Sequence, residues 1–280
     1  MTSHNFKMLQ ASKQLIESIN TDNPLASRLI GSTAVAICCP NAIELWNSLK
    51  RKNVSDIDIV TTPSYLKHVY KSLFNLGYSF QDRANLVSTA LYQRPLFDSP
   101  DKSFHVEILS SPLILHHRLI LDWNNCPNPF TVNLTDLFLS KLQFEFKDTD
   151  NEDFQEQMQA QLIDLTVLLF EIPLNDGKPT TLFVKRITRL ASSDWALFKT
   201  LFDNLIRLQK AIASDFARKS SVSLQQVTNK ISVLIKALES EPKTCRWKTR
   251  FVLQKALPFL PIGNPVSSPL EDRWCSYVKY

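Results

Sequence analysis

The chain has 280 residues, 44% of them hydrophobic and 21% charged, which excludes general disorder and allows one large core or two modest ones. Residues 1–177 carry 14 Lys and Arg against 20 Asp and Glu, whereas residues 178–280 carry 18 against 7, so the net charges are −6 and +11. The excess of positive charge in residues 178–280 suits either a polyanionic partner or a solvated helical surface. The chain has only four glycines, which argues against glycine-rich phosphate loops.

The sequence predicts a protein without a membrane segment. No apolar run reaches the roughly 18 residues of a membrane-spanning helix, and the N-terminus lacks the apolar segment of a signal peptide. The five cysteines lack metal-ligand spacing and indicate free thiols in a reducing compartment: Cys38, Cys39, Cys126, Cys245 and Cys275. We therefore expect a cytoplasmic protein.

The first half of the chain mixes helical and extended patterns. Residues 4–19 have helical periodicity, RLIG (28–31) predicts a short strand with a tight turn, and STAVAICC predicts a helix with a Ser or Thr cap. SDIDIV predicts a strand, and Pro63 and Gly77 mark the two ends of the next helix. Three further strands are predicted near 79–87, near 88–97 and at 103–109. The pattern predicts an α+β fold with a mixed sheet flanked by helices.

The second half is almost entirely helical from Asn133 onward, where NLTDLFLSKLQFEF begins with a cap signal. The turn at 175–179 coincides with the change in charge, so we predict a domain of residues 1–177 and a basic C-terminal helical bundle of residues 178–280. Helices of this bundle are predicted near 183–191, 193–217, 223–240 and 243–256.

The stretch NVSDIDIV places two aspartates in an apolar strand. Alternate strand residues point to one face, so Asp56 and Asp58 project together while Ile57 and Ile59 point into the core. Neighbouring carboxylates repel each other unless one is protonated or a cation lies between them, and Mg²⁺ takes one or two carboxylates plus substrate phosphates. Such a pair is also common at ordinary strand ends, so a metal site and a capped strand end both remain open.

Three other features favour phosphoryl chemistry. Gly31 and Ser32 lie at a strand-to-helix turn, where backbone N–H groups and a hydroxyl suit a phosphate. Glu107 is a third acid inside the strand HVEIL, and Lys141 interrupts the apolar stripe of LFLSKLQFEF. Adjacent histidines on a strand point to opposite faces, which argues against a metal shared by His116 and His117.

In this order, Gly31-Ser32, Asp56-x-Asp58 and Glu107 resemble the nucleotidyltransferase fold typified by DNA polymerase β. RLIGSTAV, SDIDIV, LGY, DLFLSKLQ and LIDLTVLL resemble the bacterial AbiEii-type nucleotidyltransferases of abortive-infection and toxin systems. SKLQ (140–143), DWALFKT (194–200) and PKTCRWKTR (242–250) also resemble an uncharacterised bacterial nucleotidyltransferase-like group. The likeness extends over roughly residues 25–255.

The resemblance implies an enzyme that uses Mg²⁺ or Mn²⁺ to transfer a nucleoside monophosphate from an NTP to an acceptor hydroxyl. It implies that Asp56, Asp58 and Glu107 hold the metal, with the general-base role as the alternative for Glu107. Lys141 would neutralise charge on the triphosphate, and Asp164 would orient Lys141 or the base. The nucleotide would be bound by Gly31, Ser32, Arg51, Lys52 and Lys141.

The same resemblance implies an RNA acceptor, such as a tRNA end, bound through the basic half, and an antitoxin partner. Relatives carry a basic residue and an Asp before the equivalent of Asp164, where this chain has Ala160 and Gln161. That difference favours an alternative, a degenerate module that binds nucleotide or RNA without catalysis. Another alternative is an enzyme that acts on a small-molecule or protein acceptor.

Each of these residues also has an ordinary structural interpretation. Ser32 would cap a helix, Glu107 would face solvent, and Lys141 would lie along the surface with its ammonium in water. Asp164 would form a salt bridge on a helix surface, and KRK (50–52) would be a solvated helix end. The tryptophans of DWALFKT and CRWKTR are interpreted as core residues rather than as stacking platforms for nucleic acid.

Overall fold

The computed structural model describes residues 3–24, 26–51, 54, 56–81, 95–144 and 151–256. By its internal contacts the chain divides into two compact units. The sheet unit contains Met1–Ile43, Lys52–Ile114 and Arg118–Leu137, and the helical unit contains Glu44–Arg51, Leu115–His117 and Phe138–Tyr280. The turn at 175–179, where the sequence analysis places a boundary, lies inside the helical unit. None of the helices within the described ranges has the length and hydropathy of a membrane span.

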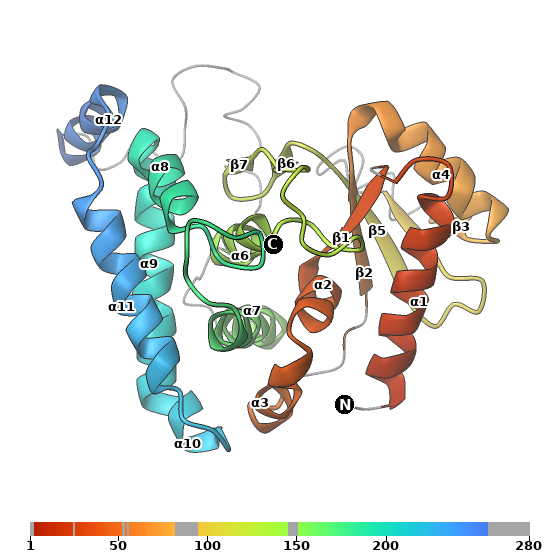
Figure 1. Cartoon of the computed structure of the whole chain (residues 1–280), viewed down its shortest axis with the longest axis horizontal. Helices are drawn as coiled ribbons and strands as arrows, with labels where there is room; N and C mark the ends of the chain where they lie inside the picture. Colours follow the sequence, from red (N-terminus) through yellow and green to blue (C-terminus); the bar gives the residue numbers. More distant parts are fainter. Residues whose placement is uncertain are drawn as a thin grey trace. The chain divides into compact units, whose positions relative to one another are not determined.

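A mixed five-stranded sheet forms the centre of the sheet unit, as the α+β prediction requires (Figure 1). In spatial order its strands are β1 (Ser27–Ile30), β2 (Asp56–Thr61), β5 (His105–Ser110), β4 (Leu96–Asp98) and β3 (Ser79–Phe80). Only the central pair, β2 and β5, is parallel, and the other pairs are antiparallel. The connection from β2 to β5 therefore has to cross over, and the helix after β2 lies within it.

The helices of the sheet unit are α1 (Ser3–Ile19), α2 (Gly31–Cys38) and α4 (Leu66–Asn75), with 3₁₀ turns at Pro40–Ala42 and Pro63–Tyr65. α3 (Ile43–Ser48) and α6 (Leu134–Leu142) each begin in this unit and continue into the helical unit. α1 contacts α4, and α2 contacts both β1 and β2 (Figure 1). Pro63 and Gly77 mark the ends of α4 and its 3₁₀ entry as predicted, and Gly77 has a φ of +83°, which few other residues adopt.

One face of the sheet carries the core of this unit. Ile57, Ile59, Val106 and Ile108 are at most 1% exposed, and they alternate with polar residues along β2 and β5. Phe97 of β4 lies on the same face, because it pairs with Val106, and its ring packs 5.5 Å from Tyr70 and 5.6 Å from Phe74 of α4. SDIDIV is thus confirmed as a strand that buries Ile57 and Ile59 on one face, and its other face carries Asp56 and Asp58 but is buried as well at Val60.

The helical unit contains most of the predicted C-terminal helices within a few residues of their expected bounds. They are α7 (Glu152–Glu171), α8 (Val184–Ser193), α9 (Trp195–Ala211) with a π turn at Ile212–Phe216, α10 (Ala217–Lys219), α11 (Gln225–Ser240) and α12 (Cys245–Ala256). α11 contacts α7, α8 and α9, and the leucines, isoleucine and valine between them are fully buried. The Asn133 side chain accepts from the backbone N–H of Thr135 at 2.8 Å, which confirms the predicted cap of α6.

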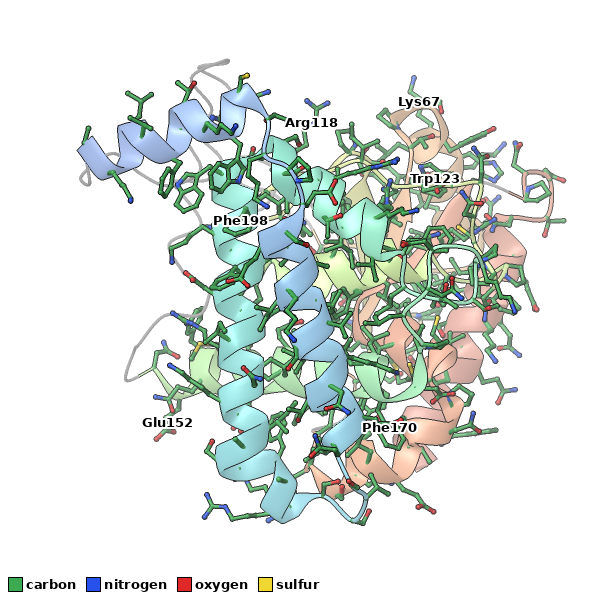
Figure 2. The ribbon with its side chains drawn as sticks, turned by 60° about the vertical axis from the view of Figure 1, so that its left-hand side comes forward. Lys67, Arg118, Trp123, Glu152, Phe170 and Phe198 are labelled. Carbon is green, nitrogen blue, oxygen red and sulfur yellow. The ribbon has the colours of Figure 1, made fainter. Side chains whose placement is uncertain are left out.

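Aromatic side chains join α9 to α12. The ring of Trp195 lies 5.0 Å from the rings of both Trp247 and Phe251. Phe198, which is labelled in Figure 2, packs against Trp247 with 5.4 Å between the ring centres. Lys243 places its ammonium 4.9 Å from the Phe198 ring. The tryptophans are half-buried in this cluster, so they hold two helices together, as the core interpretation predicts.

Two local predictions are wrong. The Ser or Thr cap expected for STAVAICC is absent, because the helix already begins at Gly31 and its N-cap is Ile30, which makes no side-chain capping bond. His116 and His117 lie in a bend between β6 (Leu113–Ile114) and β7 (Arg118–Leu119) rather than on a strand. Their rings meet edge to face at 4.7 Å instead of pointing to opposite faces. These histidines are not in a strand because residues 115–117 form the reversal that brings β7 back antiparallel to β6.

Other predictions lie in part outside the described residues. β3 ends at Phe80 and β4 begins at Leu96, and residues 82–94 of the strands expected near 79–87 and 88–97 lie outside the described residues. Lys52, Cys275 and the Pro-rich tail after residue 256 lie outside the described residues as well. The four described cysteines, Cys38, Cys39, Cys126 and Cys245, form no disulfide among themselves.

Candidate functional site

The polar face of the sheet collects the acidic residues singled out from the sequence. In the parallel pairing of β2 with β5, Asp56 stands opposite His105 and Asp58 stands opposite Glu107. Residues opposite each other in a sheet project to the same face, and so do residues two apart on one strand. Asp56, Asp58, His105 and Glu107 therefore share one face, which we call the acid face. Asp56 is exposed and the other three are partly buried, so this face is partly open to solvent.

Gly31 forms the edge of the acid face. It follows Ile30, which pairs with Asp58 across the antiparallel β1–β2 ladder. Gly31 has a φ of +73°, and a Cβ atom at this position would lie 1.8 Å from Oδ2 of Asp58. Only glycine allows this approach, because any larger residue would displace the carboxylate. The Asp58 carboxylate thus lies directly against the backbone that starts α2, with Ser32 as the next residue.

A second contact ties α2 to the beginning of β2. Thr33 is fully buried, and its hydroxyl donates to the backbone carbonyl of Asp56 at 3.0 Å. This bond fixes the strand end that carries Asp56 relative to the turn at Gly31. Two contacts therefore fix the positions of Gly31, Asp56 and Asp58 relative to one another. One is the close approach of Gly31 to Asp58, and the other is the hydrogen bond from Thr33 to the backbone of Asp56.

The acid face also contains a histidine–aspartate pair that the sequence analysis did not identify. Asp98 of β4 stands opposite His105 in the antiparallel β4–β5 ladder, and its Oδ1 lies 2.7 Å from Nδ1 of His105. The Gln81 amide contacts both side chains. A carboxylate only accepts, so the contact with Asp98 is made by an N–H at Nδ1 of His105. Asp98 precedes His105 by seven residues, on the preceding antiparallel strand, and no motif singled out in the sequence includes it.

The acids of this face carry oxygen donors, the ligand type that a divalent cation such as Mg²⁺ prefers. Within the described ranges, no group of three or more His, Cys, Asp and Glu side chains is arranged to hold a metal ion. Mg²⁺, however, takes one or two carboxylates and completes its coordination with water and substrate phosphates. The register pair Asp58 and Glu107 supplies two hard oxygen donors on one accessible face, and Asp56 is a third acid on that face.

A different arrangement surrounds Asp164, which lies on α7 in the helical unit. Its carboxylate is fully buried, and each oxygen has its own cation: Lys141 Nζ lies 2.8 Å from Oδ2, and Arg51 Nε lies 3.1 Å from Oδ1. The side chains of Lys141 and Arg51 are only 7% and 11% exposed. The Arg51 guanidinium also lies 6.0 Å from the Trp46 ring. This cluster contradicts the surface interpretation of both Lys141 and Asp164, because neither side chain is at the surface.

Arg51 is expected at phosphate from the sequence, whereas in the structure its guanidinium contacts Asp164. The two residues are separated by 113 positions, so only tertiary structure could reveal the contact. By unit, Gly31, Ser32, Asp56, Asp58 and Glu107 belong to the sheet unit, and Arg51, Lys141 and Asp164 belong to the helical unit. The structure thus brings the predicted residues together within two groups, one in each unit.

His117 is a buried neutral side chain. Its Nε2 lies 2.8 Å from the hydroxyl of Thr200. Burial is the main cause that lowers the pKa of His117 to about 3, with further lowering by His116 and Arg250 and an opposing effect of Asp194. The imidazole therefore stays uncharged at neutral pH, and it has a structural role between the β6–β7 bend and α9.

No protein-family model, curated protein or solved structure matches this chain. A proposal for its function therefore rests on the chemistry of the residues described above.

Proposed function

We propose that this chain is a Mg²⁺-dependent nucleotidyltransferase that moves a nucleoside monophosphate from an NTP to an acceptor hydroxyl. The observation that carries the proposal is the acid face, where Asp58 lies opposite Glu107 and directly against the glycine that starts α2. An accessible pair of carboxylates beside a helix start suits a metal-bound triphosphate, since the helix start favours the phosphates and the carboxylates favour the cation.

Asp58 and Glu107 would hold the cation, with Asp56 as a third acid on the same face. When bound, a divalent cation supplies charge neutralisation to the phosphoryl group and to the departing pyrophosphate. The acidic side chains cannot bind a triphosphate by themselves, because like charges repel. Nucleotide binding by this face should therefore depend on the cation.

The backbone of the chain would position the phosphates. Gly31 leaves room beside Asp58, and the first N–H groups of α2 have no partner earlier in the helix. Ser32 is half-buried at this helix start, where its hydroxyl would donate to a phosphate oxygen. The resemblance also gives Lys141 and Asp164 roles at the triphosphate, and these roles stay predictions.

The proposed acceptor is RNA, such as a tRNA end, because the C-terminal part of the chain from residue 178 onward has a net charge of +11. The family resemblance adds an antitoxin partner to this proposal. A small molecule or a protein side chain is the alternative acceptor. Binding of RNA should weaken steeply as salt is raised, whereas binding of a small neutral acceptor should not.

The proposal is tested by incubating the protein with each labelled NTP, Mg²⁺ and total cell RNA or protein. We expect label to enter one polymer with release of pyrophosphate. Asp58→Asn and Glu107→Gln should each lower the rate at least about 100-fold, since each removes a cation ligand. Asp22→Asn is the matched control, because Asp22 is an exposed carboxylate outside the sheet, and it should retain full activity. Equal activity in Asp58→Asn and wild type would refute the proposal.

A second candidate is a nucleotide- or RNA-binding module without catalysis. It is favoured by the absence, within the described residues, of a ready three-ligand group, and by Ala160 and Gln161 before Asp164. Calorimetric titration with an NTP in the presence and absence of Mg²⁺ separates the two candidates. Tight binding that is indifferent to Mg²⁺, without pyrophosphate release, would support the second candidate.

A further inference from the structure

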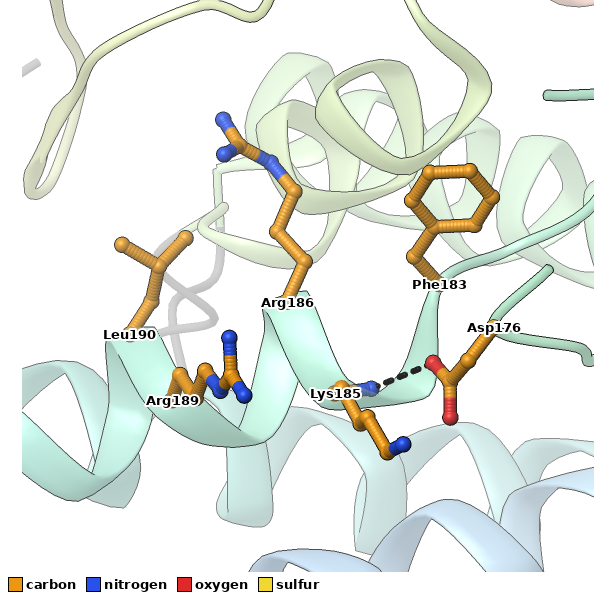
Figure 3. A pocket seen from close by; sticks show the side chains of 6 residues that line it. All are labelled: Asp176, Phe183, Lys185, Arg186, Arg189 and Leu190. Carbon is orange, nitrogen blue, oxygen red and sulfur yellow. Dashed lines mark hydrogen bonds between the residues drawn. The ribbon is translucent and has the colours of Figure 1, made fainter. Parts of the chain in front are cut away.

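A basic pocket lies on α8 in the helical unit, far along the chain from the acidic motif (Figure 3). Its volume is about 360 Å³, which falls in the range of small-ligand sites. It is lined by Asp176, Phe183, Lys185, Arg186, Arg189 and Leu190. Every one of these residues belongs to the helical unit, so the pocket is complete within that unit.

Three cations on adjacent turns of α8 line this pocket. Lys185 and Arg189 are four residues apart, and Arg186 and Arg189 are three apart, so these side chains are neighbours on the helix surface. Like charges at this spacing destabilise an isolated helix. Neither Lys185 nor Arg189 has a carboxylate partner in the part of the chain that the structure describes, and both are exposed. A polyanion bound here would relieve this repulsion.

Asp176 is the one acidic residue of the lining, and its side chain binds the backbone at the start of α8. Asp176 Oδ1 accepts from the backbone N–H of Lys185 at 2.7 Å, as Figure 3 shows. This bond stands in for an N-cap, because Phe183 at the N-cap position makes no side-chain capping bond. Asp176 therefore fixes the start of α8, and the lining keeps a net charge of +2 when Asp176 is counted.

We propose that this pocket binds the phosphodiester backbone of single-stranded RNA. The guanidinium groups of Arg186 and Arg189 match phosphate oxygens in pairs, and Lys185 adds a point charge. Phe183 lines the pocket, is half-buried, and extends to the same side of the helix as Arg186 (Figure 3). Its ring offers a face on which a base stacks next to its own phosphate.

This inference deepens the proposed function, because it names the element that would hold the RNA acceptor. An anionic membrane surface is the competing occupant of a basic patch. A membrane-binding helix combines its cations with a continuous, exposed apolar face. Here the apolar members of the lining, Phe183 and Leu190, are only half-exposed, and the adjoining Ile187 is buried. Single-stranded RNA is therefore the better fit.

The test measures binding of a fluorescent 12-nucleotide single-stranded RNA to the full chain by anisotropy at several salt concentrations. Lys185→Gln/Arg189→Gln should weaken binding at least about 10-fold and lower the slope of log K against log salt by about 1.4, since two phosphate contacts are lost. The matched control is Lys67→Gln/Lys71→Gln, which removes two exposed lysines of α4 (Lys67 is labelled in Figure 2) and should change the affinity less than twofold. Equal losses in the two double variants would overturn the proposal.

Phe183→Leu gives a second readout. It should weaken binding about 10-fold while leaving the salt slope unchanged, because stacking does not release counterions. Binding to vesicles that contain anionic lipid is measured in parallel, to test the membrane surface as the alternative occupant. If the double variant at Lys185 and Arg189 loses vesicle binding but keeps RNA binding, the RNA proposal is wrong.

The failure of this inference can be told apart from the failure of the proposed function. The RNA titrations use no NTP and no metal, and they are repeated with Asp58→Asn. RNA binding that depends on Lys185 and Arg189 supports the pocket even if no nucleotide is ever transferred. Nucleotide transfer without any contribution of Lys185 and Arg189 to RNA binding supports the enzyme and refutes the pocket.

Discussion

The carboxylates of the acid face and the carboxylate of Asp164 lie in opposite environments. Asp56 is exposed and Asp58 and Glu107 are half-exposed on the open face of a sheet, where acids stand side by side. Asp164 is fully buried, and two cations, Lys141 and Arg51, each contact one of its oxygens. The helical unit thus pairs its buried carboxylate with two cations, whereas the acids of the sheet unit lie on a face that is partly open to solvent.

This difference has a physical consequence for function and for stability. A buried charge is tolerated only with partners, so removing one member of the Asp164 cluster leaves an uncompensated charge in the interior. Charges on an accessible face are solvated, so their removal has little effect on stability. The Asp164 cluster therefore contributes to stability, and the acids of the sheet face remain the proposed site of a cation.

The largest expected effect comes from Asp164→Ala, which leaves Lys141 and Arg51 buried without their anion. We expect the free energy of unfolding to fall by about 3–5 kcal/mol. Urea denaturation followed by circular dichroism measures it. The matched control is Asp215→Ala, which breaks the exposed pair of Asp215 with Lys219 at 2.6 Å and should cost about 0.5 kcal/mol. A loss below about 1 kcal/mol for Asp164→Ala would show that the cluster is not a buried compensated charge.

An intermediate effect is expected for Gly31→Ala. Alanine has to adopt a φ of +73°, which costs about 1 kcal/mol, and its Cβ meets the Asp58 carboxylate, which adds about 2 kcal/mol. In the Asp58→Ala background the carboxylate is gone, so only the backbone cost of about 1 kcal/mol should remain. A double-mutant cycle by urea denaturation measures the coupling. An equal cost of Gly31→Ala in both backgrounds would mean that Asp58 does not lie against Gly31.

The smallest expected effect concerns His117, which is buried but neutral. In the unfolded chain a histidine titrates near 6.5, whereas burial lowers the pKa of His117 to about 3 in the fold. Between these values the unfolded state binds the proton and the folded state does not, so stability falls as the pH falls below about 6.5. From pH 7.5 to pH 5 this contribution amounts to about 2 kcal/mol. The loss is complete only near pH 3.

The measurement compares the pH dependence of wild type with that of His117→Gln, which keeps a hydrogen-bonding group beside Thr200. Wild type should lose about 2 kcal/mol more than the variant between pH 7.5 and pH 5. Parallel stability curves for the two proteins would show that His117 is protonated equally in the folded and unfolded states.

Much of the fold could be predicted from local patterns. SDIDIV, the helix between Pro63 and Gly77, and the helices after residue 178 all follow from periodicity and from residues that begin or end helices. The shared face of Asp56 and Asp58 followed from the period of a strand alone. The cap of α2 was predicted wrongly, because Gly31 starts the helix in a left-handed conformation that Ser32 would not adopt as easily.

Other contacts were beyond any local pattern. Asp98 meets His105 because β4 and β5 pair in one register, and Arg51 meets Asp164 across 113 residues. Neither strand register nor long-range ion pairs leave a periodic trace in the sequence, because their partners are chosen by packing. The bend between β6 and β7 likewise depends on which residues pair, so His116 and His117 could not be placed from their spacing.

The residue types along the chain therefore specified which side chains could do chemistry: paired acids in a strand, a glycine at a turn, and cations clustered after residue 178. The folded chain decided which of these side chains meet. It set Asp58 opposite Glu107 and against Gly31, and it buried Lys141 and Arg51 on Asp164. The reason is that local sequence controls backbone conformation over a few residues, whereas the burial and pairing of charges are properties of the whole packed unit.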